Sequence, residues 1–237
     1  MENVDKLVVV TGGTKGIGKA ILEVFGEQGY SLATCSRNEN DLDVLKKELE
    51  SKFGVNVHTN TADLSKKQDT ESFIEFIRMI GKSVLVLVNN TGRFEPGGIL
   101  SESDGSLEHL INTNLYSAYR VTRGLVPMMK KKGSGHIFNM CSTASIMAYE
   151  NGGSYCISKF ALYGMSKVLR EELKESKIKV TSVLPGATFT ASWEGADIPE
   201  ERFMKARDVA EMVYSTFKLS PQSVVEDLLI RPQLGDL

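Results

Sequence analysis

Residues 7–30 read LVVVTGGTKGIGKAILEVFGEQGY, and this stretch decides the fold. Four apolar residues are followed by Thr11 and a turn rich in glycine. After Gly16 the apolar residues recur every three or four positions, which is the period of a helix with one buried face, and Gly29 ends that helix. The stretch therefore predicts a strand, a glycine-rich turn and a helix in succession.

A turn of this kind suits a dinucleotide. Glycines let the backbone approach a diphosphate closely, and the free N–H groups at the start of the following helix attract its negative charge. The spacing of Gly12, Gly16 and Gly18 differs from the common G-x-G-x-x-G pattern, so a plain tight turn remains an alternative at this point.

The second predicted strand, residues 31–35, ends in Ser36 and Arg37 instead of an acidic residue. In dinucleotide-binding folds an acidic residue here binds the ribose hydroxyls, whereas an arginine accommodates a 2′-phosphate. Lys15 offers a second cation from the glycine-rich turn. The sequence therefore favours NADPH/NADP+ over NADH, with simple exposure of both cations as the alternative.

The alternation of strands and helices continues along the chain. It is typical of an α/β fold with a doubly wound, seven-stranded parallel sheet and helices on both faces (Rossmann-type), formed by a single domain over residues 1–237. Ligands bind beyond the carboxyl ends of such strands, so we expect the glycine-rich turn, Asn90, Ser142, Pro185 and Gly186 to gather at one edge. The further strands are expected at residues 55–59, 83–88, 136–140, 178–184 and 224–230, and long helices at 104–131, 154–174 and 199–219.

A tyrosine and a lysine stand four residues apart in the helix expected at 154–174. Tyr155 and Lys159 therefore lie on the same helical face and can point into one pocket. A neighbouring ammonium favours the phenolate form of a tyrosine, which makes that tyrosine usable for proton transfer. Alone, the pair also fits an ordinary solvated helix face.

The composition limits the classes of function. A formal net charge of −2 over 237 residues argues against a nucleic-acid binder. The three cysteines and three histidines are scattered, so we expect reduced thiols and no metal site. The polar start and the short apolar run after it indicate neither a signal peptide nor a membrane span, and we expect a cytoplasmic protein.

Five motifs together make the chain resemble the short-chain dehydrogenase/reductase family, essentially from end to end. TGGTKGIG at 11–18 is similar to the family's TGxxxGxG turn, and NNTG at 89–92 to its NNAG, with Thr91 in place of alanine. IFNMCS at 137–142 resembles the strand that carries the catalytic serine. YCISK at 155–159 matches YxxxK, and PGATFT at 185–190 resembles PGxxxT.

The resemblance implies a catalytic set of Asn114, Ser142, Tyr155 and Lys159. Tyr155 is the expected general acid for the nascent alkoxide, and Ser142 the hydrogen-bonding partner of the carbonyl oxygen. Lys159 is expected to lower the pKa of Tyr155 and to hold the nicotinamide ribose. Asn114 is expected to position a water in a proton relay, through a kink in its helix.

The resemblance also implies the residues that hold the cofactor. Gly12, Gly16, Ile17 and Gly18 are expected at the diphosphate, Asp63 and Leu64 at the adenine, and Asn90 at the adenosine ribose. Thr188 and Thr190 are expected to orient the carboxamide and the diphosphate. The expected cofactor-binding set is Gly12, Thr14, Lys15, Gly16, Ile17, Gly18, Ser36, Arg37, Asp63, Leu64, Asn90, Tyr155, Lys159, Pro185, Gly186, Thr188 and Thr190.

In the family, the helices corresponding to 104–131 and 154–174 form an interface between subunits. We therefore expect a homodimer or homotetramer, with Leu115, Tyr119, Leu162 and Met165 on the outward faces. A substrate loop is expected at 189–204. The apolar side chains near the substrate are expected to be Phe189, Trp193 and Met204, joined by Phe94 and Met147.

The leading hypothesis is an NADPH-dependent reductase that converts a small-molecule carbonyl into an alcohol. The same catalyst could work as an NADP+-linked alcohol dehydrogenase, because the chemistry is reversible. A non-catalytic NADPH-sensing protein is the alternative from another class, and the complete set of Ser142, Tyr155, Lys159 and Asn114 counts against it.

Overall fold

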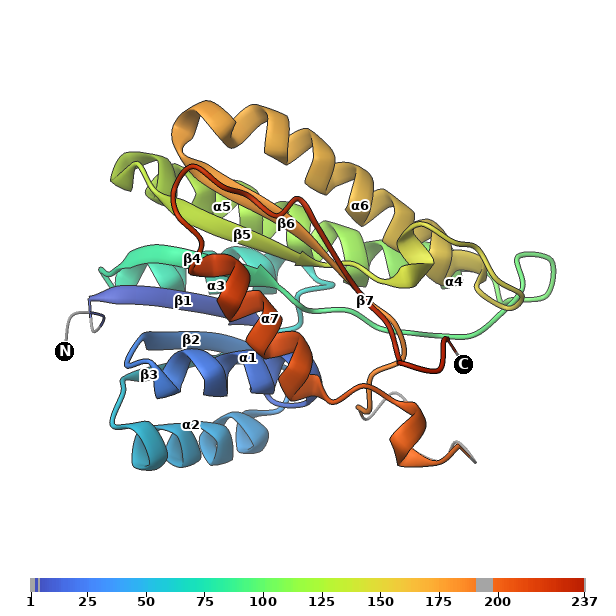
Figure 1. Ribbon diagram of the computed structural model, residues 1–237, viewed down its shortest axis with the longest axis horizontal. Helices are drawn as coiled ribbons and strands as arrows, with labels where there is room; N and C mark the ends of the chain where they lie inside the picture. Colours follow the sequence, from blue (N-terminus) through green and yellow to red (C-terminus); the bar gives the residue numbers. More distant parts are fainter. Residues whose placement is uncertain (1–2, 4, 191–197, 237) are drawn as a thin grey trace.

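The computed structural model describes residues 3, 5–190 and 198–236, and over these residues the predicted fold is confirmed. Seven parallel strands form one sheet in the order β3-β2-β1-β4-β5-β6-β7 (Figure 1). The order reverses at β1, which pairs with β2 on one side and β4 on the other. The strands are β1 Lys6–Thr11, β2 Ser31–Ser36, β3 Val57–Thr61, β4 Ser83–Asn89, β5 Gly135–Met140, β6 Ile178–Pro185 and β7 Asp227–Ile230.

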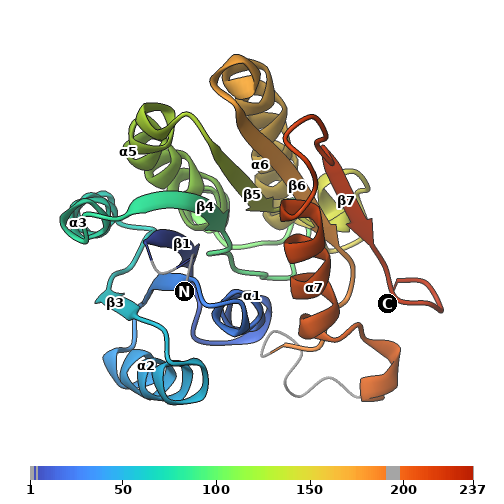
Figure 2. The same cartoon turned by 60° about the vertical axis from the view of Figure 1, so that its left-hand side comes forward.

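Helices cover both faces of the sheet, each with its own core (Figure 2). On one face, α1 (Gly16–Glu27), α2 (Glu39–Phe53) and α7 (Ala206–Phe217) pack their apolar residues against the strands. On the other face lie α3 (Lys67–Met79), α5 (Ser117–Lys132) and α6 (Gly153–Leu173). Side chains of β1 such as Val8 and Val9 are fully buried and point to opposite cores, which explains the continuous apolar run of that strand.

Local sequence fixes several of the helix ends. The Asn38 side chain accepts hydrogen bonds from the backbone N–H groups of Asn40 (3.0 Å) and Asp41 (3.3 Å), and so caps the start of α2. Gly54 and Gly133 follow α2 and α5 with φ angles of 65° and 71°, the left-handed conformation that glycine adopts at least cost.

The helix expected at 104–131 is three consecutive segments. A short helix, α4 (Ser106–Leu110), passes into a π-helical turn, η1 (Ile111–Tyr116), before α5 begins. π-Helical turns insert an extra residue and are frequent at functional sites. The turn carries Asn114, whose side chain is fully buried, so the long helix is interrupted at the residue where a kink was expected.

Two strands and one further helix differ from their predicted bounds by two residues or more. β3 begins at Val57 instead of residue 55, and β7 at Asp227 instead of residue 224. The predicted helix 199–219 begins only at Ala206, because the chain before it makes a 3₁₀ turn and then extends. The backbone of Met204 accepts a hydrogen bond from Phe189 N–H (2.9 Å) and donates one to Ala187 O (3.0 Å). These two groups of Met204 are therefore bonded to the loop after β6 instead of to a longer helix.

The prediction that Leu162 faces outward is wrong. Leu162 is 1% exposed and packs with Ala118, Cys141 and Leu184, because α6 lies against the end of β6 at this position. Leu115 and Met165 are partly buried against the same cluster. Tyr119 is exposed, as expected.

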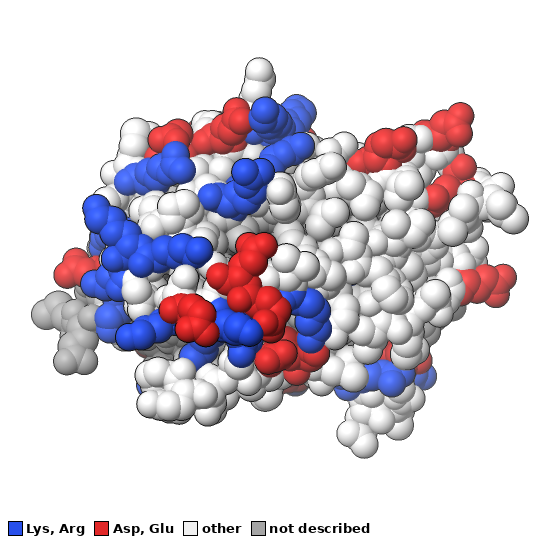
Figure 3. Space-filling view, turned by 90° about the horizontal axis from the view of Figure 1, so that it is seen from above, with Lys and Arg blue, Asp and Glu red and all other residues white. Residues whose placement is uncertain are grey.

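Seen from the side of α6, the surface has two parts (Figure 3). Lysines and arginines gather toward the end at which α5 and α6 terminate, where residues such as Lys130, Lys131, Lys132 and Arg170 face the negative ends of the helix dipoles. Much of the remaining surface in this view is uncharged.

The three cysteines are free and buried. Within the described residues, neither a cluster of metal-binding side chains nor a helix suited to crossing a membrane is found.

Candidate active site

Two adjoining cavities lie beyond the carboxyl ends of the strands. The larger, of about 480 Å³, is lined by the glycine-rich turn and by residues after β2 and β3. The smaller, of about 350 Å³, is lined by residues after β5 and β6 and by the start of α6. Their linings share Ile17, Asn90, Gly92, Arg93 and Thr190. The segments expected to gather at one edge therefore do so.

The glycine-rich turn leaves no room for other residues. Gly12 and Gly16 have φ angles of 66° and 56°, which other residues rarely adopt. A Cβ at Gly18 would lie 2.4 Å from Asn90 Nδ2 and 2.6 Å from Gly12 O. The Asn90 amide donates to Thr11 O (3.0 Å) and Gly12 O (2.9 Å), which ties the turn to the end of β4. The turn is a fixed cradle at the start of α1, and Lys15, the residue before this helix, provides no side-chain cap.

Polar groups surround the far end of the larger cavity. Thr14 donates to Ser36 (3.4 Å), and Arg37 lies on the same wall. Lys15 lies 3.8 Å from Asp41. Asp63 accepts a hydrogen bond from the Ser65 hydroxyl (2.7 Å). Burial opposes ionisation of Asp63, but hydrogen bonds from Ser65 and the charges of Lys66 and Arg37 lower its pKa overall. Leu64 lines the same cavity.

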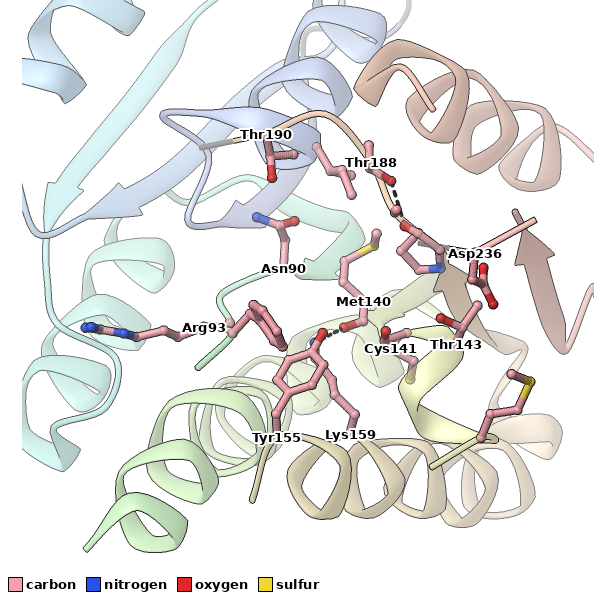
Figure 4. Close-up of a pocket in the computed structure, with 18 of the residues that line it drawn as sticks. Asn90, Arg93, Met140, Cys141, Thr143, Tyr155, Lys159, Thr188, Thr190 and Asp236 are labelled. Atoms are coloured by element: carbon pink, nitrogen blue, oxygen red, sulfur yellow. Dashed lines mark hydrogen bonds between the residues drawn. The ribbon is translucent and has the colours of Figure 1, made fainter. Parts of the chain in front are cut away.

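Tyr155, Ser142 and Lys159 line the smaller cavity (Figure 4). Tyr155 and Lys159 come from adjacent turns of α6, and Ser142 comes from the end of β5. The Ser142 side chain favours the ionised form of the Tyr155 hydroxyl, and both residues line the same cavity. Ser142 Oγ accepts from Ala144 N–H (3.1 Å), which fixes the serine hydroxyl in the mouth of the cavity.

Lys159 is hydrogen-bonded to the backbone of β5. Its ammonium donates to Met140 O (2.7 Å) and lies 5.9 Å from the centre of the Tyr155 ring. Burial lowers the pKa of Lys159 to about 8. Burial also raises the pKa of Tyr155 to about 12, against the opposing effect of the Ser142 side chain. The pKa of Tyr155 is therefore raised in this structure, contrary to the lowering expected from Lys159, because loss of solvation outweighs the effects that lower it.

Asn114 stands behind the cavity. Its amide donates to Ser158 Oγ (2.8 Å) and Arg93 O (3.0 Å), and its oxygen accepts from Arg93 N–H (2.7 Å). Asn114 is not one of the described residues that line the two cavities. A Cβ at Gly92 would lie 3.4 Å from both Asn114 Oδ1 and Lys159 Nζ, so the glycine packs closely against both groups.

Pro185 and Gly186 end β6 and form part of the cavity wall. Gly186 N–H donates to Ile230 O (2.8 Å), and Thr188 Oγ1 donates to Gly186 O (3.0 Å). Thr190 lies where the two cavities meet.

Of the apolar residues predicted near the substrate, only Phe94 and Met147 line the cavity among the described residues. Met204 is buried in the core between the sheet and α7, so its prediction is wrong. Phe189 stacks edge-on with Phe203 instead. Trp193 lies outside the described residues.

Asp236 was not predicted as a site residue. The chain after β7 returns to the cavity, and the Asp236 carboxylate enters it from a different side than Tyr155 (Figure 4). Arg231 holds this carboxylate through two hydrogen bonds of 3.2 and 2.6 Å. Sequence reasoning missed Asp236 because it belongs to no motif, and only the return of the terminal segment brings it to the cavity.

Comparison with known proteins identifies relatives over most of the chain. The sequence profile of the family described as short chain dehydrogenase matches residues 6–200. A sepiapterin reductase of Chlorobaculum tepidum is 29% identical and covers 98% of each chain. An oxidoreductase of Bacillus subtilis is 37% identical over 78% of this chain and 70% of its own.

The fold also matches solved structures. An alcohol dehydrogenase from the archaeon Thermococcus sibiricus, complexed with 5-hydroxy-NADP, superposes with a TM-score of 0.90. It is 27% identical in sequence, and the match covers 96% of this chain and 97% of the archaeal one.

Proposed function

This chain belongs to the short chain dehydrogenase family and is an oxidoreductase, and on that premise we propose that it uses NADPH to reduce a small-molecule carbonyl to an alcohol. One observation carries the proposal. The phenol of Tyr155 and the hydroxyl of Ser142 line one cavity, which shares five lining residues with the cavity of the glycine-rich turn. A proton donor and a dinucleotide cradle therefore lie side by side.

The residues of the larger cavity fit a phosphorylated dinucleotide. Gly12, Gly16, Ile17 and Gly18 would hold the diphosphate at the start of α1, where backbone N–H groups are free. Arg37 and Lys15, with Thr14 and Ser36 between them, would bind the 2′-phosphate. The remaining contacts are assigned by their place in the linings: Asp63 and Leu64 to the adenine, Asn90 to the adenosine ribose, and Pro185, Gly186, Thr188 and Thr190 to the nicotinamide end.

NADPH, when bound, supplies the hydride that the carbonyl carbon accepts. The chain supplies the proton. Ser142 donates a hydrogen bond to the carbonyl oxygen, and Tyr155 transfers its phenolic proton to that oxygen as negative charge develops. Lys159 would hold the nicotinamide ribose and, with a water bound to Asn114, return a proton to the tyrosine.

The protonation state of Tyr155 favours the direction of reduction. With a pKa of about 12 the phenol keeps its proton at neutral pH, as a general acid must. The reverse reaction, an NADP+-linked alcohol dehydrogenase, needs the phenolate and is therefore expected to become faster only in alkaline solution. The archaeal relative carries the name of an alcohol dehydrogenase, so both directions belong in the test.

The smaller cavity indicates the kind of substrate. Phe94, Met147 and Tyr149 provide an apolar wall, and Thr143 and Asp236 place two hydrogen-bond acceptors on another side. A volume of about 350 Å³ suits a small molecule. We assign to this cavity a carbonyl compound with an apolar body and at least one hydroxyl or amino group remote from the carbonyl.

The protein is further proposed to work as a homodimer or homotetramer in the cytoplasm. Tyr116, Tyr119, Ile157, Phe160 and Val168 expose apolar surface along η1, α5 and α6, and burying it against a second copy would be favourable. Reduced, buried thiols suit a reducing compartment. A monomer by light scattering at micromolar concentration would contradict the oligomer.

The test follows the oxidation of NADPH by its absorbance, with a panel of carbonyl compounds. The panel includes diketones, hydroxyketones, aminoketones and acetoacetyl thioesters. We expect turnover with NADPH, a weaker rate with NADH, and alcohol oxidation with NADP+ only at alkaline pH. Failure to oxidise NADPH with every member of the panel would contradict the proposal.

A further inference from the structure

We propose that Glu102, on the segment between β4 and α4, is a positioning residue for Tyr155: its carboxylate anchors the first turn of α6, on which the tyrosine stands. This inference rests on the proposed role of Tyr155 as the proton donor. It concerns a residue that lies outside the five family motifs and outside the described residues lining both cavities.

The first turn of α6 lacks a cap of its own. The residue before the helix is Gly152, which has no side chain to accept hydrogen bonds from the first backbone N–H groups. Unpaired N–H groups at a helix start favour an acceptor, and preferably an anionic one. No acidic residue stands in the first turn of α6 either, so the local sequence leaves this end of the helix unsupported.

Glu102 provides the missing acceptor from 52 positions earlier in the chain. One carboxylate oxygen accepts a hydrogen bond from Ser154 N–H (3.3 Å), and the other accepts a short hydrogen bond from the Ser154 hydroxyl. Ser154 is 1% exposed and directly precedes Tyr155. Both bonds thus hold the backbone immediately next to the proposed proton donor.

The contact is closely packed. A Cβ at Gly153 would lie 2.4 Å from Gly97 O and 2.8 Å from the Glu102 carboxylate, so the segment and the helix touch backbone to backbone. Gly97 N–H donates to Asn151 O (2.9 Å) on the approach to the helix. The helix start has no free space in which to shift along its axis while Glu102 stays in place.

The same segment touches the site at two more points. The Phe94 ring packs edge-on against the Tyr155 ring, with centroids 4.9 Å apart. The backbone of Arg93 exchanges hydrogen bonds of 2.7 and 3.0 Å with the Asn114 amide. One segment therefore contacts the tyrosine ring, the backbone before the tyrosine, and the asparagine of the proposed relay. Releasing its Glu102 end would disturb the orientation of Tyr155 more than the glycine-rich turn, which lies between β1 and α1.

The experiment compares Glu102→Gln and Glu102→Ala with the wild type in the full-length protein, using the best substrate of the carbonyl panel. Asp208→Asn is the matched control, because Asp208 is an exposed acid in the first turn of α7. We expect Glu102→Ala to lower kcat by about tenfold or more, the size that a misplacement below 1 Å produces, with KM for NADPH unchanged. Glu102→Gln retains one accepting oxygen and should keep an intermediate kcat.

Two further measurements separate positioning from general stabilisation. In a double-mutant cycle, Ser154→Ala should lower kcat in the wild type but have little further effect in Glu102→Ala, because the two residues act through the same bonds. Amide hydrogen exchange should speed up in the peptide containing residues 153–156 and stay unchanged in the glycine-rich turn.

An unchanged kcat in Glu102→Ala, or an equal loss in Asp208→Asn, would overturn the inference. A rise in KM for NADPH that matches the fall in kcat would do the same. The exchange measurement needs no substrate. Should the wild type fail to reduce any carbonyl, unchanged exchange at 153–156 in Glu102→Ala would still overturn the anchor independently of the proposed function.

Discussion

The two cavities are built in different ways. The larger one, beyond β1, β2 and β3, takes its shape from backbone: glycines with positive φ, a free helix start, and exposed cations at its far end. The smaller one takes its character from side chains that arrive from α6, from the end of β5 and from the segment after β7. The backbone of the larger cavity suits a dinucleotide, which many proteins bind. The side chains of the smaller cavity would place one proton donor, the phenol of Tyr155, next to the carbonyl oxygen of the substrate.

This contrast predicts that substitutions in the two cavities affect different kinetic constants. Changes in the smaller cavity should alter kcat or the KM of the carbonyl substrate. Changes in the larger cavity should alter the choice and affinity of the cofactor. The contrast would be contradicted if a substitution in one cavity changed the kinetic constants assigned to the other cavity.

The largest effect is expected for Tyr155→Phe. Removing the hydroxyl takes away the proton donor and should lower kcat by about a thousandfold, while NADPH affinity stays within about twofold because the cradle is intact. Turnover and fluorescence titration with NADPH measure the two quantities. Tyr214→Phe, which removes a hydroxyl bonded to Gln28 on the other side of the sheet, is the control. Undiminished turnover in Tyr155→Phe would refute the mechanism.

The next largest effect is expected for Arg37→Asp. The new carboxylate removes a charged hydrogen-bond donor and repels the 2′-phosphate, so the preference for NADPH over NADH should fall by about a hundredfold. The ratio of kcat/KM for the two cofactors measures it. Lys47→Asp, on the exposed side of α2, makes the same change of charge away from the cavity. If both variants keep the wild-type ratio, the assignment of the phosphate to Arg37 is wrong.

A smaller effect is expected for Asp236→Asn. The amide keeps the size of the carboxylate but weakens its hydrogen bonds, so KM for a hydroxyketone or aminoketone should rise by about tenfold. A ketone of similar size without the donor group serves as the control and should keep its KM. Equal changes for the two substrates would mean that Asp236 only holds Arg231 and the terminal segment.

The smallest effect is expected from pH. The pKa of Lys159 is lowered to about 8 by burial, so its ammonium loses the proton above that pH. The kcat/KM for NADPH should then fall by about fivefold between about pH 7 and pH 9, if the ammonium holds the ribose. The free energy of unfolding changes in the opposite sense and increases as the pH rises. The unfolded chain keeps this proton up to about its ordinary pKa of 10.5, so the contribution of Lys159 to the free energy of unfolding rises from pH 8 to that value. A flat kcat/KM profile in this range would exclude the ribose role.

The sequence alone determined the order of the strands and helices, the glycine-rich turn and the residue types of the proposed site. These follow from local rules: apolar periodicity, the φ angles that only glycine adopts easily, and the four-residue spacing of Tyr155 and Lys159 on one helical face. Parallel strands also bring their carboxyl ends together, which is why the gathering of distant motifs at one edge could be predicted.

Only the tertiary structure decided what surrounds those residues. Burial, and not the spacing in the helix, sets the pKa of Tyr155 and turns Lys159 toward Met140 O. Glu102 and Asp236 reach the site across 52 residues and from the end of the chain, and no local pattern marks either. Desolvation and long-range contacts depend on how all layers pack, so they cannot be read from neighbouring residues.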